Sequence, residues 1–296
     1  MVDKALLFGQ AKKKEHMSQD YVLLDSGNGK KLEQFGKYTL IRPANQAIWK
    51  LHQPALWEKS AAEFIRQGKE TGTWKDGNGV LPKQWTLQHD GLHYTIQPNE
   101  FGNVGLFPEH WQHQEWIKEK IGKAKGLNIL NLFSYTGSNS IFLVKQGHKL
   151  VQVDSSRQSM DILNKNLEIN GLTGQCRLIL DDVLKFLQRE VKRGSKYDAI
   201  ILDPPTYGRG KNGEIFKIEK DLPNLLELVA ALLAPEFKFV LFTCHTPGYT
   251  PLVLKNTFRG YFRGNMETGE VEVEDLYGKY LPGGTYLRLS QKNSYK

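Results

Sequence analysis

The segment LNILNLFSYTGSNS, residues 127–140, decides how the second part of this 296-residue chain is interpreted. Its apolar run, Ile129–Phe133, is typical of a strand buried in a parallel sheet. Small residues around Gly137 interrupt that run, and a second apolar run at Ile141–Val144 has helical character. A strand, a turn and a helix in this order present backbone N–H groups and the positive end of a helix dipole to an anionic ligand. Gly137 would let the ligand approach the backbone closely, although an ordinary strand-to-helix turn is the alternative.

The alternation of strand and helix continues along the chain. Further strands are expected at 150–153, 177–180, 198–202 and 237–243. Helices are expected at 156–170, from 183 to about 193, around 222–233 and from Pro251 onward. Two closing strands at 271–273 and 285–289 complete the pattern. Repeated βα units predict a doubly wound, mostly parallel sheet of seven strands, which binds its ligand at the carboxyl ends of the strands.

The first part of the chain has a different character. Short β-type runs at 21–24, 31–35, 38–41, 85–87 and 93–96 alternate with Gly and Pro, and one helix is expected near 57–67. All six tryptophans precede residue 117. The sequence therefore predicts a smaller β-rich α+β N-terminal domain over residues 1–116 and a second domain over residues 117–296. By elimination, we expect the N-terminal domain to recognise the substrate.

Composition and charge narrow the class of protein. A hydrophobic content of 40% and a charged content of 24% are typical of a soluble globular protein, and no apolar stretch is long enough to span a membrane. Two cysteines cannot form a disulfide framework, so a cytoplasmic location is expected. The net charge is +8, and residues 117–296 hold 26 lysines and arginines against 19 acids. A basic surface attracts polyanions such as nucleic acid, although it can also serve only solubility.

Acidic residues follow two of the expected strands. Asp154 ends the second strand, where related dinucleotide-binding folds use a carboxylate to bind ribose hydroxyls. Asp181 and Asp182 follow the third strand. Each of these residues could instead serve only as a helix N-cap. Together with the turn at Gly137, they indicate a ligand that contains a nucleoside.

The fourth strand ends in Asp203, Pro204 and Pro205. Two prolines fix the backbone and remove two N–H donors, so carbonyl groups and a carboxylate remain to face the edge of a nucleobase; a rigid strand exit is the alternative. A basic stretch follows, which contains Tyr207, Arg209, Lys211, Phe216, Lys217 and Lys220. We expect this stretch to contact RNA phosphates or to stack on a base, and a solvated loop is the competing interpretation.

Five segments carry a resemblance to a known family: LNLFSYTGSNS, VDSSRQSMDILNKNLEINGL, DDVLKFLQRE, YDAIILDPPTYGRG and FVLFTCHTPG. In order and spacing they resemble the motifs of class I S-adenosylmethionine-dependent methyltransferases. More closely, they resemble the bacterial large-subunit ribosomal RNA methyltransferases of the cytosine-C5 and guanine-N7 types. The segment FGNVGLFPEHW, residues 101–111, resembles the lead-in to the catalytic domain of that family. The resemblance implies a Rossmann-like methyltransferase sheet, S-adenosyl-L-methionine as the cofactor and RNA, in particular ribosomal RNA, as the partner.

The resemblance also implies roles for individual residues. The residues that would line the methionine end of the cofactor are Phe133, Ser134, Tyr135, Thr136 and Gly137. Asp154 would bind the ribose hydroxyls, and Asp182 with Val183 would address the adenine. Asp203 and Pro204 would border the methyl group and the incoming base.

The methylated atom depends on Cys244, which follows the fifth strand. Cytosine C5 is not nucleophilic and needs a cysteine thiolate to add to C6, whereas a nitrogen needs only alignment. The resemblance places the nucleophile of cytosine-C5 enzymes at Cys244, and a charged His245 nearby could lower its pKa. A small buried hydrophobic residue is the alternative. His110 and His113 form an HxxH pair that is too weak a signal for a metal site, so no metal is expected.

The sequence thus predicts an S-adenosylmethionine-dependent methyltransferase that acts on a base in RNA. The same cofactor with a small-molecule acceptor is the first alternative. A nicotinamide-dependent oxidoreductase would share the sheet and Asp154, but residues 134–138 do not match the G-x-G-x-x-G pattern.

Overall fold

The structure is a computed structural model that describes residues 20–68, 71–77, 81–210 and 213–291. The chain divides into two compact units. The first unit contains the residues up to Pro108 together with Glu272–Pro282, and the second contains Glu109–Val271 and the residues from Gly283 onward. The sequence-based division after residue 116 did not include the returning segment. In the described part of the chain, no helix is both long and apolar enough to cross a membrane.

The first unit is built on a five-stranded sheet in the order β1-β2-β3-β4-β5, in which only the β3–β4 pair is parallel. A separate pair, β6 and β7, is antiparallel. The elements are β1 (Tyr21–Gly27), β2 (Lys30–Phe35), β3 (Tyr38–Pro43), α2 (Pro54–Trp57), β4 (Ala62–Arg66), β5 (Gly72–Asp76), β6 (Trp85–His89) and β7 (Leu92–Ile96).

The prediction of a helix near residues 57–67 is wrong. Helix α2 ends at Trp57, and strand β4 occupies Ala62–Arg66. The strand is stabilised by partners that are distant in sequence, since Ala62 pairs with Leu40 and Phe64 pairs with Trp74. A local pattern does not contain such long-range pairing.

A buried ion pair stabilises the sheet of the first unit. Arg42 donates through Nε and Nη2 to the two carboxylate oxygens of Glu33, at 2.6 and 2.8 Å. Burial alone would raise the pKa of Glu33, but the charges and hydrogen bonds of Arg42 and Lys31 lower it to about 2. Removing Arg42 would leave the carboxylate buried without its principal counter-charge.

The second unit contains a seven-stranded sheet in the order β10-β9-β8-β11-β14-β16-β15. Strands β8–β11 and β14 run parallel, and β16 is antiparallel to β14. Its strands are β8 (Asn128–Leu132), β9 (Lys149–Asp154), β10 (Cys176–Leu180), β11 (Ala199–Leu202), β14 (Phe239–Cys244), β15 (Asn265–Glu274) and β16 (Tyr280–Ser290). The doubly wound, mostly parallel Rossmann-like sheet and the preceding β-rich region confirm the predicted fold class.

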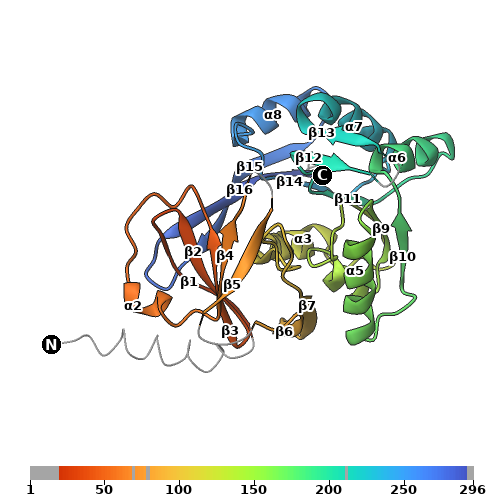
Figure 1. Ribbon diagram of the computed structural model, residues 1–296. Helices are drawn as coiled ribbons and strands as arrows, with labels where there is room; N and C mark the ends of the chain where they lie inside the picture. The colour runs from red at the N-terminus through yellow and green to blue at the C-terminus, as the bar shows by residue number, and fades with distance from the viewer. Residues whose placement is uncertain (1–19, 69–70, 78–80, 211–212, 292–296) are drawn as a thin grey trace. The chain divides into compact units, whose positions relative to one another are not determined.

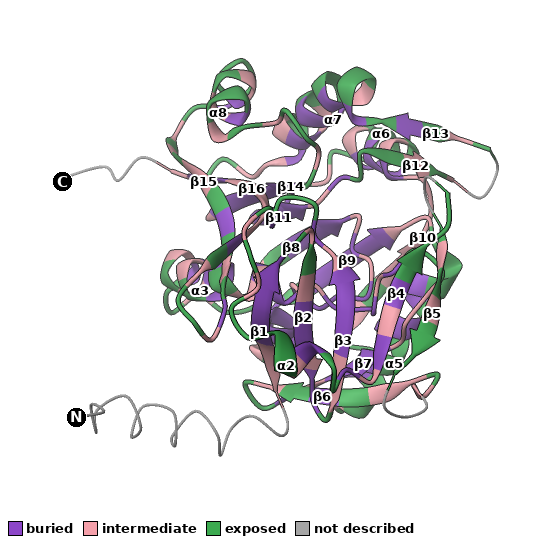
Figure 2. Cartoon of the chain, turned by 60° about the vertical axis from the view of Figure 1, so that its left-hand side comes forward, coloured by how far each residue is buried: buried purple, intermediate pink, exposed green. Residues whose placement is uncertain are grey.

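Helices cover both faces of this sheet (Figure 1). The α-helices are α3 (Gln114–Ile121), α4 (Ile141–Lys145), α5 (Arg157–Ile169), α6 (Val183–Lys192), α7 (Ile218–Leu232) and α8 (Pro251–Arg259), and a 3-10 helix, η1 (Pro108–His113), precedes α3. The apolar side chains of α6, α7 and α8 join alternate residues of β8, β9, β11 and β14 in one core. Figure 2 shows that the central strands are buried, whereas the outer surfaces of α7 and α8 are exposed.

The segment Glu272–Pro282, which contains the end of β15, the turn after it and the start of β16, packs within the first unit. Leu281 is 4% exposed and lies in a cluster with Leu23 and two alanines. The Ser26 hydroxyl donates to Oδ2 of Asp275 at 3.2 Å, and the Gln46 side chain donates to the carbonyl of Pro282 at 2.7 Å. A segment that is late in the sequence therefore completes the core of the N-terminal unit.

Candidate active site at the carboxyl ends of the strands

The carboxyl ends of four parallel strands are aligned in register. Leu132, the last residue of β8, pairs with Val153 of β9 and with Leu202 of β11. Leu180 at the end of β10 pairs with Asp154. The residues that follow each strand therefore emerge at one edge of the sheet, as the sequence pattern predicted for a ligand site.

The turn after β8 has an unusual backbone. Phe133 and Tyr135 have φ values of 55° and 49°, which place two non-glycine residues in the left-handed region. Such residues cost of the order of 1–3 kcal/mol each and gather at ligand sites. The turn is tied to the next strand end, because the backbone N–H of Tyr135 donates to Oδ2 of Asp154 at 2.8 Å.

Gly137 contributes in a way that the sequence analysis did not anticipate. Its φ is 74°, and a Cβ at this position would lie 3.0 Å from Cγ of Leu163 and 3.3 Å from Cγ1 of Ile141. The missing side chain therefore leaves room for α5 and α4, and the expectation that it leaves room for a ligand is wrong. Gly137 allows the turn to pack closely on the helices that follow it.

Asp154 is held by backbone donors and is not the N-cap of α5. Ser156 is the N-cap, and its hydroxyl accepts the N–H of Ser159. Asp154 accepts the N–H of Ser156 on Oδ1 at 2.8 Å, in addition to that of Tyr135 on Oδ2. Burial raises the pKa of Asp154, and these backbone bonds oppose the rise. A carboxylate offers about four acceptor positions, so this arrangement leaves capacity for ribose hydroxyls.

The acids after β10 agree more closely with the alternative interpretation, in which they cap a helix. Asp182 is the N-cap of α6, where its Oδ1 accepts the N–H of Lys185 at 2.9 Å. Asp181 accepts the N–H of Asp182 and forms an ion pair with Arg189. Val183 is 4% exposed and belongs to the core, so its side chain is not available to a ligand.

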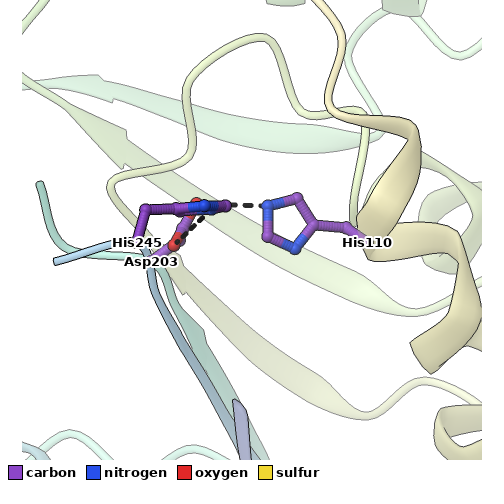
Figure 3. Close-up of side chains that lie close together, drawn as sticks. All are labelled: His110, Asp203 and His245. Carbon is purple, nitrogen blue, oxygen red and sulfur yellow. Dashed lines mark ion pairs between the residues drawn. The ribbon is translucent and has the colours of Figure 1, made fainter. Parts of the chain in front are cut away.

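Asp203 lies in a cluster with two histidines (Figure 3). Its Oδ2 is 3.3 Å from Nε2 of His110, and its Oδ1 is 3.8 Å from Nε2 of His245. The hydroxyl of Thr243 donates to Oδ1 at 2.7 Å. Burial alone would raise the pKa of Asp203, but the charges of His110 and His245 and the hydrogen bonds from His110 and Thr243 hold that pKa well below its usual range. The carboxylate is therefore ionised and fixed in orientation.

His110 is the functional candidate that sequence reasoning missed. It belongs to η1, far from Asp203 in sequence, and was considered only as part of the HxxH pair. Burial alone would lower the pKa of His110, but the charge and hydrogen bond of Asp203 raise it. His113 faces elsewhere: its Nδ1 accepts from Arg288 at 3.0 Å, and burial with the charges of His110 and Arg288 lowers its pKa to about 2. The position of His110 in the lead-in segment was the available signal.

Cys244 is enclosed by the core of the second unit. Its side chain is 1% exposed and packs among the apolar residues of β11, β14, α7 and α8. Burial raises the pKa of the thiol, and hydrogen bonds from Thr246 oppose the rise. A buried thiol of high pKa is a small hydrophobic residue in this environment and a poor source of thiolate.

The basic stretch after Pro205 forms a hairpin of β12 (Tyr207–Arg209) and β13 (Ile215–Lys217). Tyr207 is 40% exposed, and the Arg209 guanidinium lies 5.8 Å from its ring centroid and donates to its hydroxyl. Phe216 is 7% exposed and packs on Phe133 at 5.2 Å, so it is not available to stack on a base. Lys211 lies outside the described residues. The hairpin is thus joined to the turn after β8 by an aromatic contact.

A mostly parallel sheet with polar residues at the aligned carboxyl ends of its strands is typical of enzymes that bind a nucleoside-containing cofactor. Residues 63–260 match the family model described as S-adenosylmethionine-dependent methyltransferase. The chain belongs to this family, and its cofactor is S-adenosyl-L-methionine.

Two solved structures resemble the whole chain. The S-adenosylmethionine-dependent methyltransferase from Agrobacterium tumefaciens is 32% identical, with a TM-score of 0.88 over 94% of this chain and 92% of that chain. SMU.776, described as a methyltransferase and crystallised with S-adenosylhomocysteine, shares the fold at 19% identity, with a TM-score of 0.73 over 97% of this chain and 79% of that chain.

Curated relatives are named as ribosomal RNA enzymes. Ribosomal RNA large subunit methyltransferase K/L of Syntrophotalea carbinolica is 32% identical over 68% of this chain, which spans only 26% of the length of that protein. Ribosomal RNA large subunit methyltransferase K of Neisseria meningitidis is 27% identical over 85% of this chain and 69% of its own length.

Proposed function

We propose that the protein transfers the methyl group of S-adenosylmethionine to a nitrogen atom of a base in RNA, and that the RNA is ribosomal. The relatives named as ribosomal RNA methyltransferases support this substrate. The net charge of +8 is also suited to a polyanion. Tyr207 and Arg209 would contact the RNA from the β12–β13 hairpin, and Lys211 is expected to do so as well.

The residues at the strand ends fit the cofactor. Asp154 would accept hydrogen bonds from the ribose hydroxyls, since its two backbone donors fix the carboxylate without exhausting its acceptor capacity. The turn from Phe133 to Gly137 would bind the methionine end, and the region of Asp182 and Val183 would adjoin the adenine. When bound, S-adenosylmethionine supplies an electrophilic methyl group on its sulfonium.

The choice of nitrogen rests on one observation: the Asp203 carboxylate is oriented by Thr243 and His110 at the end of β11, whereas Cys244 is buried in the core. Methylation at cytosine C5 would require a thiolate at Cys244. A ring or exocyclic nitrogen is already nucleophilic and gains positive charge as it reacts, which the Asp203 carboxylate would stabilise. Because the pKa of Asp203 is so low, this group would act as an anion and hydrogen-bond acceptor, and the proton of an amine would pass to solvent.

Pro204 and Pro205 would assist by fixing the path of the chain after β11. Neither residue has an N–H group, so the backbone offers only carbonyl acceptors to the base. The Thr243 hydroxyl would keep the Asp203 carboxylate in one orientation. Alignment of the nitrogen with the methyl group supplies much of the rate in a direct displacement.

The test is mass-spectrometric mapping of modified nucleotides in ribosomal RNA from cells with and without the protein. We expect one N-methylated nucleotide to disappear with the protein and to return with the wild-type chain and with Cys244→Ala, but not with Asp203→Asn. Loss of 5-methylcytidine together with an inactive Cys244→Ala variant would refute nitrogen methylation. An unchanged set of modified nucleotides in ribosomal RNA would indicate that the acceptor is another RNA or a small molecule.

A further inference from the structure

His110, Asp203 and His245 come from three separate segments of the second unit. Asp203 follows β11, His245 follows β14, and His110 lies on η1. Figure 3 shows the two imidazoles converging on the carboxylate. Each residue offers one ligand atom, and these atoms lie within 4.8 Å of one another. We propose that the three side chains form a binding site for a divalent transition-metal ion such as Zn²⁺, and that the bound ion inhibits the enzyme.

The donor set and its spacing are suited to such an ion. Two imidazole nitrogens and one carboxylate oxygen favour Zn²⁺ and its neighbours over Mg²⁺ or Ca²⁺, which prefer oxygen ligands. Ligand atoms around a tetrahedral Zn²⁺ lie about 3.3–3.5 Å apart, given bond lengths of about 2.0–2.2 Å. Nε2 of His110 lies 3.3 Å from Oδ2 of Asp203, and Nε2 of His245 lies 3.8 Å from Oδ1, so the two histidines are nearest to different oxygens of the carboxylate. The three ligand atoms lie within 4.8 Å of one another, so rotation of the carboxylate and of His245 would bring them to the spacing of a bound ion.

Two of the three ligands are already fixed, and the third is accessible. The His110 side chain is 4% exposed and that of Asp203 is 17% exposed, whereas that of His245 is 39% exposed. The imidazole of His245 is therefore the most accessible of the three ligands to an entering ion. The Thr243 hydroxyl bonds to Oδ1 of Asp203 and leaves Oδ2 directed toward His110, which is the kind of outer contact that orients metal ligands.

Gly284 lies directly beside the His245 imidazole. A Cβ at residue 284 would lie 3.0 Å from Nδ1 of His245 and 2.7 Å from the carbonyl oxygen of Cys244. Gly284, within β16, therefore lies beside Nδ1 of the imidazole and leaves room for it, whereas Nε2 is the atom nearest Asp203. His113 is not part of the site, because its Nδ1 is bound by Arg288 and its ring centroid is 6.3 Å from that of His110.

The metal would compete with the methyl acceptor, and this consequence rests on the proposed function. The bound ion would engage the Asp203 carboxylate, which is the group proposed to stabilise charge on the reacting nitrogen. Three protein ligands leave the fourth position of a tetrahedral ion open, and a base nitrogen that coordinates there has no lone pair left to attack a methyl group. Binding of the ion itself is independent of which substrate the enzyme uses.

Metal binding can be measured on the full chain after treatment with EDTA, by calorimetry with Zn²⁺ and by the visible absorption of Co²⁺. We expect one equivalent of Zn²⁺ and tetrahedral Co²⁺ bands. His110→Ala and His245→Ala should each weaken binding by at least about 100-fold, since even the outer partners of metal ligands are worth about 10- to 100-fold. His52→Ala, which removes an exposed histidine of the first unit, is the matched control and should bind as wild type.

Folding of each variant is checked by circular dichroism and by the affinity for S-adenosylhomocysteine, neither of which depends on RNA. Absence of a stoichiometric Zn²⁺ site in wild type, or equal affinity in wild type and His245→Ala, would overturn the proposal and leave the two histidines only as neighbours of the Asp203 carboxylate. In a methylation assay Zn²⁺ should inhibit, and EDTA should restore activity. Stoichiometric binding without inhibition would overturn the inhibitory role while the site itself stood.

Discussion

Substitution of Asp154 by Asn gives the sharpest test of the cofactor site. The carboxylate accepts two backbone N–H groups, from Tyr135 and Ser156, both at 2.8 Å. An Asn side chain has one oxygen and one NH₂ group, so it can accept only one of these two donors on its carbonyl. The other N–H would face the amide NH₂, and a buried donor would lose its partner.

The magnitude follows from the loss of charge and of one acceptor. An unsatisfied buried N–H costs about 1–3 kcal/mol, which would appear as reduced stability of the turn after β8. Hydrogen bonds to charged groups exceed neutral ones by about 1 kcal/mol each, so two ribose hydroxyls lose about 2 kcal/mol in affinity. This corresponds to about a 30-fold larger dissociation constant.

Isothermal titration calorimetry with S-adenosylmethionine and with S-adenosylhomocysteine measures this effect. The affinities for both ligands should fall equally, because the ribose is common to them and the methyl group is not involved. Asp181→Asn is the control: this carboxylate also lies at a strand end, but it accepts the N–H of Asp182 and pairs with Arg189. Binding of Asp154→Asn within about threefold of wild type, in a folded protein, would refute the role assigned to Asp154.

Four further predictions concern stability and catalysis. Arg42→Ala should lower the free energy of unfolding of the first unit by about 3–5 kcal/mol in denaturant titrations. Because the pKa of Glu33 falls from 4.5 to about 2 on folding, its stabilisation is complete above pH 4.5 and is lost as the pH falls toward 2; Glu33→Gln should remove this part of the acid dependence. Gly137→Ala should destabilise by more than about 1 kcal/mol, because of its positive φ and its contact with Leu163, and a thermal midpoint equal to wild type would contradict this. Thr243→Val should reduce kcat about tenfold while the cofactor affinity is unchanged, since it frees the Asp203 carboxylate to rotate.

The sheet of the second unit was predictable because its signals are local. The apolar run of β8 and the acids that follow β9, β10 and β11 report directly on buried strands and on their carboxyl ends. Parallel pairing then requires those ends to meet at one edge, and the register of Leu132 with Val153 and Leu202 confirms it. The fold class and the cofactor followed from these features together with the family resemblance.

The remaining features depend on contacts between distant parts of the chain. Strand β4 was taken for a helix because its partners, β3 and β5, are not visible in a local pattern. His110 meets Asp203 only because η1 returns to the end of β11, and no spacing rule connects the two residues. Gly137 was assigned correctly to the turn, but which residues occupy the space beside it depends on where α5 packs.

The assignment of Glu272–Pro282 to the N-terminal unit limits how this gene can recombine. A fragment that stops at Pro108 lacks Leu281 and Asp275, which fill its core and bond to Ser26. A catalytic fragment that starts at Glu109 would carry the same residues with nothing to cover them. Neither unit is therefore complete when the chain is cut at Pro108, and a fragment that keeps the first unit whole must include Glu272–Pro282.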